Sequence, residues 1–128
     1  MAVNDAVFST AALDACLTVI SGSDELYMGS GAIPTTRAEA ISGAAHAAAI
    51  VPGFQAITTG TPSGRELGVD TKDMTANAGV TLAWIALCTL SGTTLNYVQE
   101  LAATQAVTSS EVWTMPAFTI TLPNYDAA

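Results

Sequence analysis

The stretch Val80-Thr-Leu-Ala-Trp-Ile-Ala-Leu-Cys-Thr-Leu90 decides how this chain folds. Its middle, from Leu82 to Leu87, is apolar at every position, so neither side of an extended strand could face water there. A strand that is apolar on both sides is typical of the interior of a sheet covered on both faces. We therefore expect residues 80–90 to form a central strand.

Further strand patterns lie on either side of this stretch. Residues 91–93 form a predicted turn, and the alternating residues 95–101 after it indicate a hairpin partner. Pro116 interrupts the last pattern, which favours an edge position or a bulge at that point. Four other segments read as strands: 25–29, 54–58, 65–69 and 112–122.

The first part of the chain is helical in pattern. Residues 5–20 predict a helix, with Asp5 as a candidate N-cap. The spacing of the large apolar residues places four of them on one helical face: Leu13, Cys16, Leu17 and Ile20. We expect this face to pack on the sheet.

Two segments between the helix and the central strand are short and rich in small residues. Pro34 favours the start of a short helix over residues 34–40, whereas residues 43–53 fit neither helix nor strand clearly. The whole pattern predicts an α+β fold in which the N-terminal helix packs on a mainly antiparallel β-sheet or β-sandwich. A length of 128 residues favours one domain, 1–128.

Charge is scarce in this chain and mostly negative. Charged residues make up 11% of the sequence, against about 25% in an average soluble domain, and the net charge is −8. The cations are Arg37, Arg65 and Lys72, too few for a basic groove, so we expect no binding to nucleic acid or to anionic membranes. No apolar run reaches the roughly 18 residues of a membrane span. The N-terminal segment contains no lysine or arginine, so we expect no secretory signal there.

Candidate catalytic or metal-binding residues are few. The single histidine, His46, has alanine neighbours and is expected to be structural. Lys72 stands between Asp70 and Asp73 and opposes cation binding there, and the adjacent Asp24 and Glu25 are expected to be solvated. We therefore expect a protein that is not an enzyme and that has no catalytic, cofactor-binding or metal-binding residues.

The aromatic and cysteine residues allow more than one interpretation. Trp84 and Trp113 are expected to pack in the core or an interface, although a carbohydrate-binding platform remains an alternative. Cys16 and Cys88 are expected to be buried free thiols, because free cysteine behaves as a small apolar residue. A disulfide between them stays open if the two elements pack together.

Several short segments carry a resemblance in their order and spacing. They are Ala12-Leu-Asp-Ala-Cys-Leu17, Pro34-Thr-Thr-Arg-Ala-Glu-Ala40, Ser63-Gly-Arg-Glu-Leu-Gly-Val69, Gly79-Val-Thr-Leu-Ala-Trp-Ile-Ala-Leu87, Leu95-Asn-Tyr-Val98, Thr108-Ser-Ser110 and Met115-Pro-Ala-Phe-Thr-Ile120. With them the chain resembles a group of small virion proteins encoded among the head-morphogenesis genes of tailed bacteriophages. The group usually has a polar residue, often histidine, in the strand that is apolar here.

The resemblance implies a virion structural protein and supplies no catalytic residues. Within that class we expect a capsid decoration or cement protein that binds and stabilises the outer shell. Alternatives are a head–tail connector, a tail or fibre component, or a carbohydrate-binding module. The expected partners are the major capsid protein or other virion proteins and further copies of this chain, with a trimer favoured. The expected location is the capsid surface, after synthesis in the host cytoplasm.

A weakly charged chain must expose apolar residues, and exposed apolar patches mark interaction sites. The residues that fit the sheet least well lie between Ile33 and Phe54 and at the chain ends. The candidate interface residues are Val3, Ile33, Pro34, Arg37, Ile50, Val51, Phe54 and Tyr125.

Overall fold

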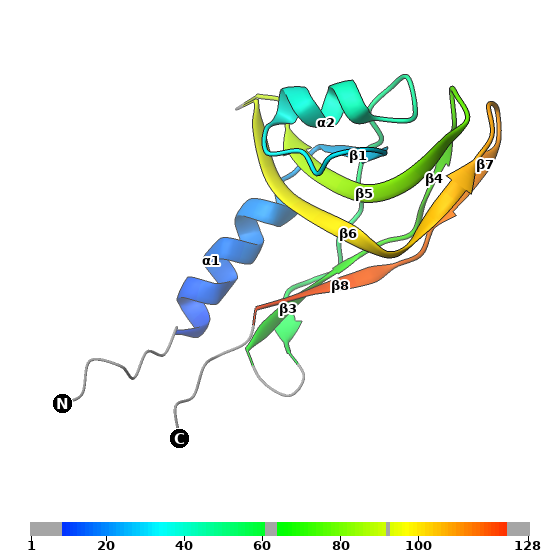
Figure 1. The fold of residues 1–128 in the computed structure, drawn as a ribbon. Helices are drawn as coiled ribbons and strands as arrows, with labels where there is room; N and C mark the ends of the chain where they lie inside the picture. Colours follow the sequence, from blue (N-terminus) through cyan, green and yellow to red (C-terminus); the bar gives the residue numbers. More distant parts are fainter. Residues whose placement is uncertain (1–8, 61–63, 92, 123–128) are drawn as a thin grey trace.

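Helices and antiparallel strands make up the computed structural model, which describes residues 9–60, 64–91 and 93–122 (Figure 1). The elements are α1 Thr10–Ser21, β1 Glu25–Gly29, α2 Arg37–Gly43, β2 Thr58–Thr59, β3 Arg65–Val69, β4 Lys72–Thr75, β5 Val80–Thr89, β6 Thr94–Val107, β7 Val112–Met115 and β8 Phe118–Leu122. The α+β fold with an N-terminal helix on mainly antiparallel sheets is confirmed. None of the helices in these ranges is long and apolar enough to cross a membrane.

Strand β5 lies in the middle of a three-stranded sheet of order β1-β5-β6. Its side chains alternate between two clusters. Ile85 and Leu87 point into the larger one, which we call the main core, and Trp84 and Ala86 point into a smaller one on the other face. Both faces are therefore covered, and the prediction of a central strand over residues 80–90 is confirmed.

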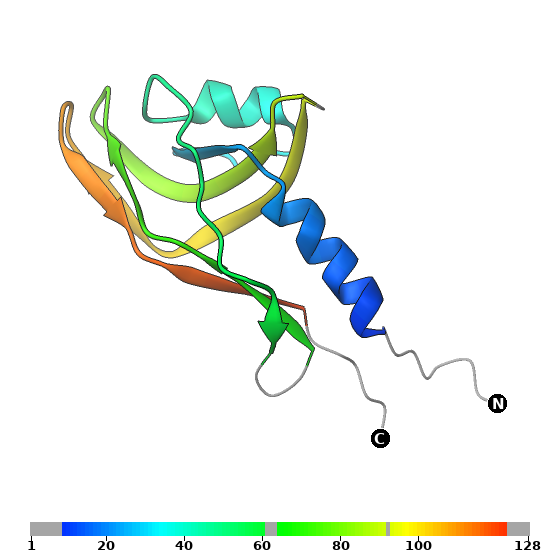
Figure 2. The ribbon, with the colours of Figure 1, turned by 180° about the vertical axis from the view of Figure 1, so that it is seen from behind.

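The other strands cover the main-core face of this sheet. They form a sheet of order β2-β3-β8 and a two-stranded sheet of β4 and β7. Figures 1 and 2 show β3, β4, β7 and β8 as one bent layer, with α2 on the opposite side of the β1-β5-β6 sheet. Pro116 and Ala117 separate β7 from β8, so the predicted interruption at Pro116 divides one strand pattern into two strands.

Helix α1 begins later than its sequence pattern predicts. Ser9 is the N-cap, and its side chain accepts a hydrogen bond of 3.1 Å from the N–H of Ala12. The prediction of Asp5 as the cap of this helix is wrong, because Ser9 already occupies that role; Asp5 itself lies outside the described residues. Leu13, Leu17 and Ile20 are buried, as expected for the face that packs on the sheet.

Helix α2 also begins after its predicted start at Pro34. Thr36 is the N-cap, and its hydroxyl oxygen accepts the N–H of Glu39 at 3.2 Å. Glu39 in turn accepts the N–H of Thr35 at 2.8 Å. The first bond satisfies one free N–H of the first helical turn, and the second ties the residue before the cap to the helix, which begins at Arg37.

The segment between α2 and β2 is mostly irregular. It follows the open edge of β1, where Ala44 and Ile50 form isolated bridges to Gly29 and Leu26. The prediction of a strand over 54–58 is wrong, because Phe54 forms only an isolated bridge to Val69. Regular strand pairing with β3 begins only at Thr58. Before it, Phe54 and Ile57 pack their side chains against the main core without forming a strand.

Candidate interaction surface

Helix α2 forms a platform that rests on Trp84. Ala40 is fully buried in the smaller cluster with Trp84, under the helix. A Cβ added at Gly29 would lie 2.3 Å from Trp84 Cζ2, and one at Gly43 would lie 2.8 Å from the same atom. The indole ring therefore fills space that two glycines leave open, and it holds α2 close to the sheet.

An ion pair fastens the start of α2 to β1. Arg37 Nε and Nη2 donate to the two carboxylate oxygens of Glu25 at 2.7 and 3.1 Å. Glu25 is buried, and the hydrogen bonds from Arg37 hold its pKa below its usual value. The expectation that Glu25 is solvated is wrong, because the chain folds α2 over it. Asp24, by contrast, is exposed, and it accepts the N–H of Leu90 at 2.9 Å.

A hollow of about 370 Å³ lies between α2 and the loop that precedes it. Its lining residues are Ser30, Ala32, Ile33, Pro34, Thr35, Glu39, Ser42 and Gly43. The Glu39 carboxylate in this wall accepts the N–H and the hydroxyl of Thr35, which lower its pKa. The one charged group of the hollow is thus already engaged in holding the loop, and the rest of the wall is small or apolar.

Large apolar side chains are exposed on and near this platform. Ile33 is 40% exposed, Ile41 is 43% exposed and Val51 is 70% exposed. We call the surface formed by α2, the hollow and the exposed Ile33 and Ile41 the α2 face. Ile41 was not among the predicted interface residues, because a sequence pattern cannot show which side of a seven-residue helix remains uncovered.

The other predicted interface residues have different environments. Pro34 is buried, and Arg37 is engaged with Glu25. Ile50 and Phe54 are half-buried and pack against the main core, so they contribute more to the fold than to an outer surface. Val3 and Tyr125 lie outside the described residues.

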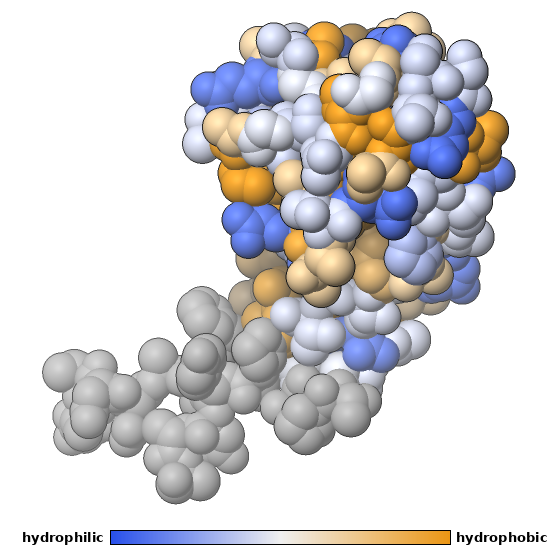
Figure 3. All heavy atoms as spheres, turned by 45° about the vertical axis from the view of Figure 1, so that its right-hand side comes forward, coloured by the Kyte–Doolittle hydropathy of each residue, from blue (hydrophilic) through white to orange (hydrophobic). Residues whose placement is uncertain are grey.

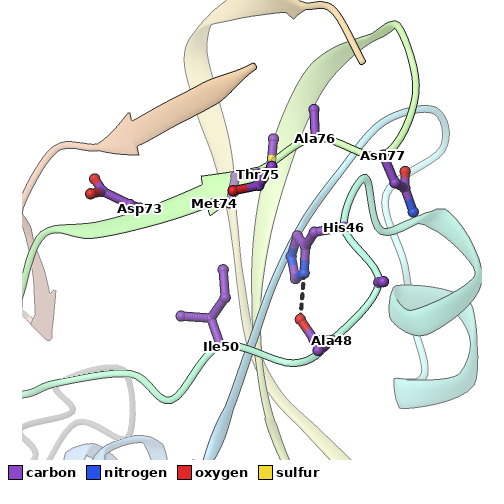
Figure 4. A pocket seen from close by; sticks show the side chains of 9 residues that line it. His46, Ala48, Ile50, Asp73, Met74, Thr75, Ala76 and Asn77 are labelled. Atoms are coloured by element: carbon purple, nitrogen blue, oxygen red, sulfur yellow. Dashed lines mark hydrogen bonds between the residues drawn. The ribbon is translucent and has the colours of Figure 1, made fainter. Parts of the chain in front are cut away.

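His46 is held by backbone groups on both sides of its ring. Nε2 accepts the N–H of Met28 at 3.0 Å, so the ring proton is on Nδ1, which donates to the carbonyl oxygen of Ala48 at 2.7 Å (Figure 4). The ring also stacks on Tyr27, with centroids 5.9 Å apart. Burial lowers the pKa of His46, which keeps the ring in this neutral form.

A second hollow of about 410 Å³ lies beside His46, between the 46–50 loop and β4 (Figure 4). Asp73 at its rim accepts a hydrogen bond from the hydroxyl of Thr114, whereas Asp70 accepts one from the side-chain amide of Gln55. The two carboxylates thus serve different contacts. Across the described ranges, no three histidine, cysteine or acidic side chains gather in a way that could hold a metal ion.

The two cysteines are both free but differ in exposure. Cys88 is buried, as expected, and burial raises its pKa to about 11. Cys16 is exposed on α1, so the expectation of a buried thiol is wrong there, because the helix turns only Leu13, Leu17 and Ile20 inward. The structure contains no bond between the two sulfur atoms.

The face of the molecule drawn in Figure 3 is consistent with the low charge of the chain. Figure 3 shows a face composed largely of residues of intermediate hydropathy, with separate hydrophobic patches between scattered hydrophilic residues.

Comparison with protein families, with curated proteins and with solved structures found no match for this chain.

Proposed function

We propose that this protein is a non-enzymatic structural component of a tailed-bacteriophage virion, and specifically a capsid decoration or cement protein. In this role it binds the major capsid protein on the outer shell and stabilises contacts between neighbouring subunits. Support comes from the ordered sequence segments that resemble phage virion proteins and from a surface with few charges to desolvate. Such surfaces suit permanent assembly partners, because charged residues are depleted at the centres of interfaces.

The observation that carries the proposal is the α2 face, where Ile33 and Ile41 are exposed on a rigid support. The Arg37–Glu25 pair fastens the helix from one end, and Trp84 packs beneath it. Side chains held in place before binding lose less conformational entropy when a partner covers them. Apolar contacts of this kind also resist salt, because they do not depend on attraction between charges.

The polar groups that could perform chemistry are engaged in structural contacts. Both ring nitrogens of His46 bond to backbone atoms, Glu25 is paired with Arg37, and Glu39 accepts two hydrogen bonds from Thr35. These arrangements favour a binding role over catalysis.

The test combines copy counting with a binding assay. Quantitative mass spectrometry of purified virions is expected to find hundreds of copies per particle, whereas six or twelve copies would indicate a connector or tail component instead. In the binding assay, Ile41→Asp is expected to lose cosedimentation with shells that lack the protein. The control Leu90→Asp changes another exposed apolar residue, 55% exposed, in the β5–β6 turn and is expected to bind normally. Absence from virions, or equal binding by both variants, would contradict the proposal.

A further inference from the structure

The outer edge of β1 is covered by residues 44–50, which we call the edge strap. At one end of the strap, Leu26 and Ile50 exchange two backbone hydrogen bonds, from the N–H of Leu26 at 2.7 Å and from the N–H of Ile50 at 3.1 Å. Towards the other end, the N–H of Ala45 donates to the carbonyl oxygen of Met28 at 2.9 Å. An uncovered strand edge presents N–H and C=O groups with which another strand can pair. The edge strap therefore closes this side of the β1-β5-β6 sheet.

A histidine side chain completes this cover in the middle of the strap. The N–H of Met28 donates to Nε2 of His46 at 3.0 Å rather than to a backbone carbonyl. The other ring nitrogen, Nδ1, donates to the carbonyl oxygen of Ala48 within the strap at 2.7 Å. Met28 is fully buried and His46 is 8% exposed, so water has little access to these bonds. The attachment of the strap to β1 thus depends on a ring nitrogen that carries no proton.

Protonation of His46 would remove this acceptor. The imidazolium ion carries a hydrogen on each ring nitrogen, so Nε2 and the N–H of Met28 would face each other as two donors. A buried N–H without an acceptor is unfavourable, and so is a charge placed in apolar surroundings. Both costs are relieved when the strap leaves the edge and the ring reaches water. We propose that His46 is an acid-sensitive latch, whose protonation releases the edge strap and uncovers the outer edge of β1.

The described groups around the ring do not compensate a positive charge there. Tyr27 on β1 stacks on the ring, and burial raises the pKa of its hydroxyl, which therefore stays neutral in acid. Asp73 on β4 lies at the rim of the hollow beside the ring, but its carboxylate points away and accepts a hydrogen bond from the Thr114 hydroxyl (Figure 4). Glu25, at the start of β1, is already paired with Arg37. An imidazolium ion gains more from solvent than from these neighbours.

Acid favours the open strap because burial lowers the pKa of His46 only while the strap is closed. A free imidazole protonates near pH 6.5, so the open form takes up the proton first. The ratio of open to closed form should then rise by up to about tenfold for each pH unit below about 6.5, until the closed form is protonated as well. This device involves only the strap and β1, so it does not depend on the proposed role in the virion.

Hydrogen exchange of the full chain, followed by NMR, tests this proposal. The Met28 amide should exchange through opening of the strap alone, so its protection should be nearly independent of urea below the unfolding transition. After correction for the intrinsic pH dependence of exchange, that protection should fall by up to about tenfold between pH 6.5 and 5.5. The Tyr27 amide faces β5 and serves as the reference, with a higher protection that decreases as urea is added.

Two results in the wild type would overturn the proposal. One is a loss of Met28 protection of less than about twofold over that pH range, far below the tenfold limit. The other is exchange of Met28 that responds to urea as steeply as exchange of Tyr27, because the strap would then open only together with the whole fold.

His46→Gln is the matched variant. Its side-chain carbonyl can accept the N–H of Met28, and the amide stays uncharged at every pH used. Met28 protection should therefore be independent of pH in this variant, whether or not the amide holds the strap as well as the imidazole does. A pH dependence that survives in His46→Gln would refute the role of His46. If the variant does not fold, the ring nitrogen chemical shifts of the wild type at neutral pH decide: the proton is expected on Nδ1, and a proton on Nε2 would exclude the latch.

Discussion

Replacing Gly29 by alanine should destabilise the protein through Trp84. The added Cβ would lie 2.3 Å from Trp84 Cζ2 and 2.4 Å from the carbonyl oxygen of Gly43. Ordinary contacts begin at 3.4 Å, so the ring or the backbone would have to move by about 1 Å. The indole ring is enclosed between α2 and the sheet, and the Gly43 oxygen belongs to the backbone, so neither can yield cheaply.

The expected cost is about 1–3 kcal/mol of unfolding free energy, the usual range for overpacking a close-packed site. Gly43→Ala should cost less, because its Cβ would lie 2.8 Å from Trp84 and its other contacts are longer. Gly22→Ala is the control, since its Cβ would meet only backbone oxygens at 3.4 Å and its φ of −77° suits alanine. That substitution should change stability by less than about 0.5 kcal/mol.

Urea denaturation followed by circular dichroism measures all three variants, and a fourth variant identifies the cause. Trp84→Leu shortens the side chain that the new methyl group would meet, so Gly29→Ala should cost less in that background than in the wild type. The difference is the coupling energy between the two sites. A cost of Gly29→Ala below 0.5 kcal/mol, or equal costs in the two backgrounds, would refute the reasoning.

Three other predictions follow from single side chains. Leu17→Ala should lower the free energy of unfolding by about 2–5 kcal/mol because Leu17 is fully buried, whereas Val19→Ala should lower it by less than about 0.5 kcal/mol. Urea denaturation compares the two variants, and equal costs would contradict the orientation of α1. The pKa of His46 is lowered in the folded protein, so the unfolded chain protonates first and stability should fall as pH drops from about 6.5 towards the lowered pKa, by at most about 1.4 kcal/mol per pH unit. Urea titrations at pH 7 and 5.5 should show this loss in the wild type and not in His46→Gln. Arg37→Ala leaves the buried Glu25 without its counter-ion and should lower the free energy of unfolding by about 1–3 kcal/mol at pH 7. The difference between the wild type and the variant should shrink as pH falls through the lowered pKa of Glu25, because the protonated carboxyl no longer needs a counter-ion. A constant difference down to pH 3 would contradict this prediction.

The predictions that depended on local patterns agree best with the structure. Residues 82–87 are apolar at every position, and Leu82 and residues 84–87 are buried because both faces of β5 are covered. The apolar spacing of α1 placed Leu13, Leu17 and Ile20 inside for the same reason. Boundaries were less accurate, because Ser9 and Asp5 are both good caps and only the folded helix shows which one is used.

The candidate site was harder to predict because its parts are distant in the sequence. Nothing near Glu25 indicates that Arg37 will neutralise it, since the pair forms only when α2 folds over β1. Likewise, the alanines around His46 suggest packing, but its acceptor role for the N–H of Met28 depends on the 44–50 loop following the edge of β1.

The sequence by itself determined the central strand, the helical character of the first described segment and the low charge of the chain, because periodicity and composition are properties of neighbouring residues and of totals. The tertiary structure alone decided which apolar residues remain outside. Cys16 and Leu17 are adjacent and both apolar, yet one is exposed and the other fully buried. A helix with apolar residues around most of its circumference can be buried on any side, and the position of the sheets selects one. Val19 on α1 and Ile33 and Ile41 on the α2 face are large apolar residues that the packing left exposed.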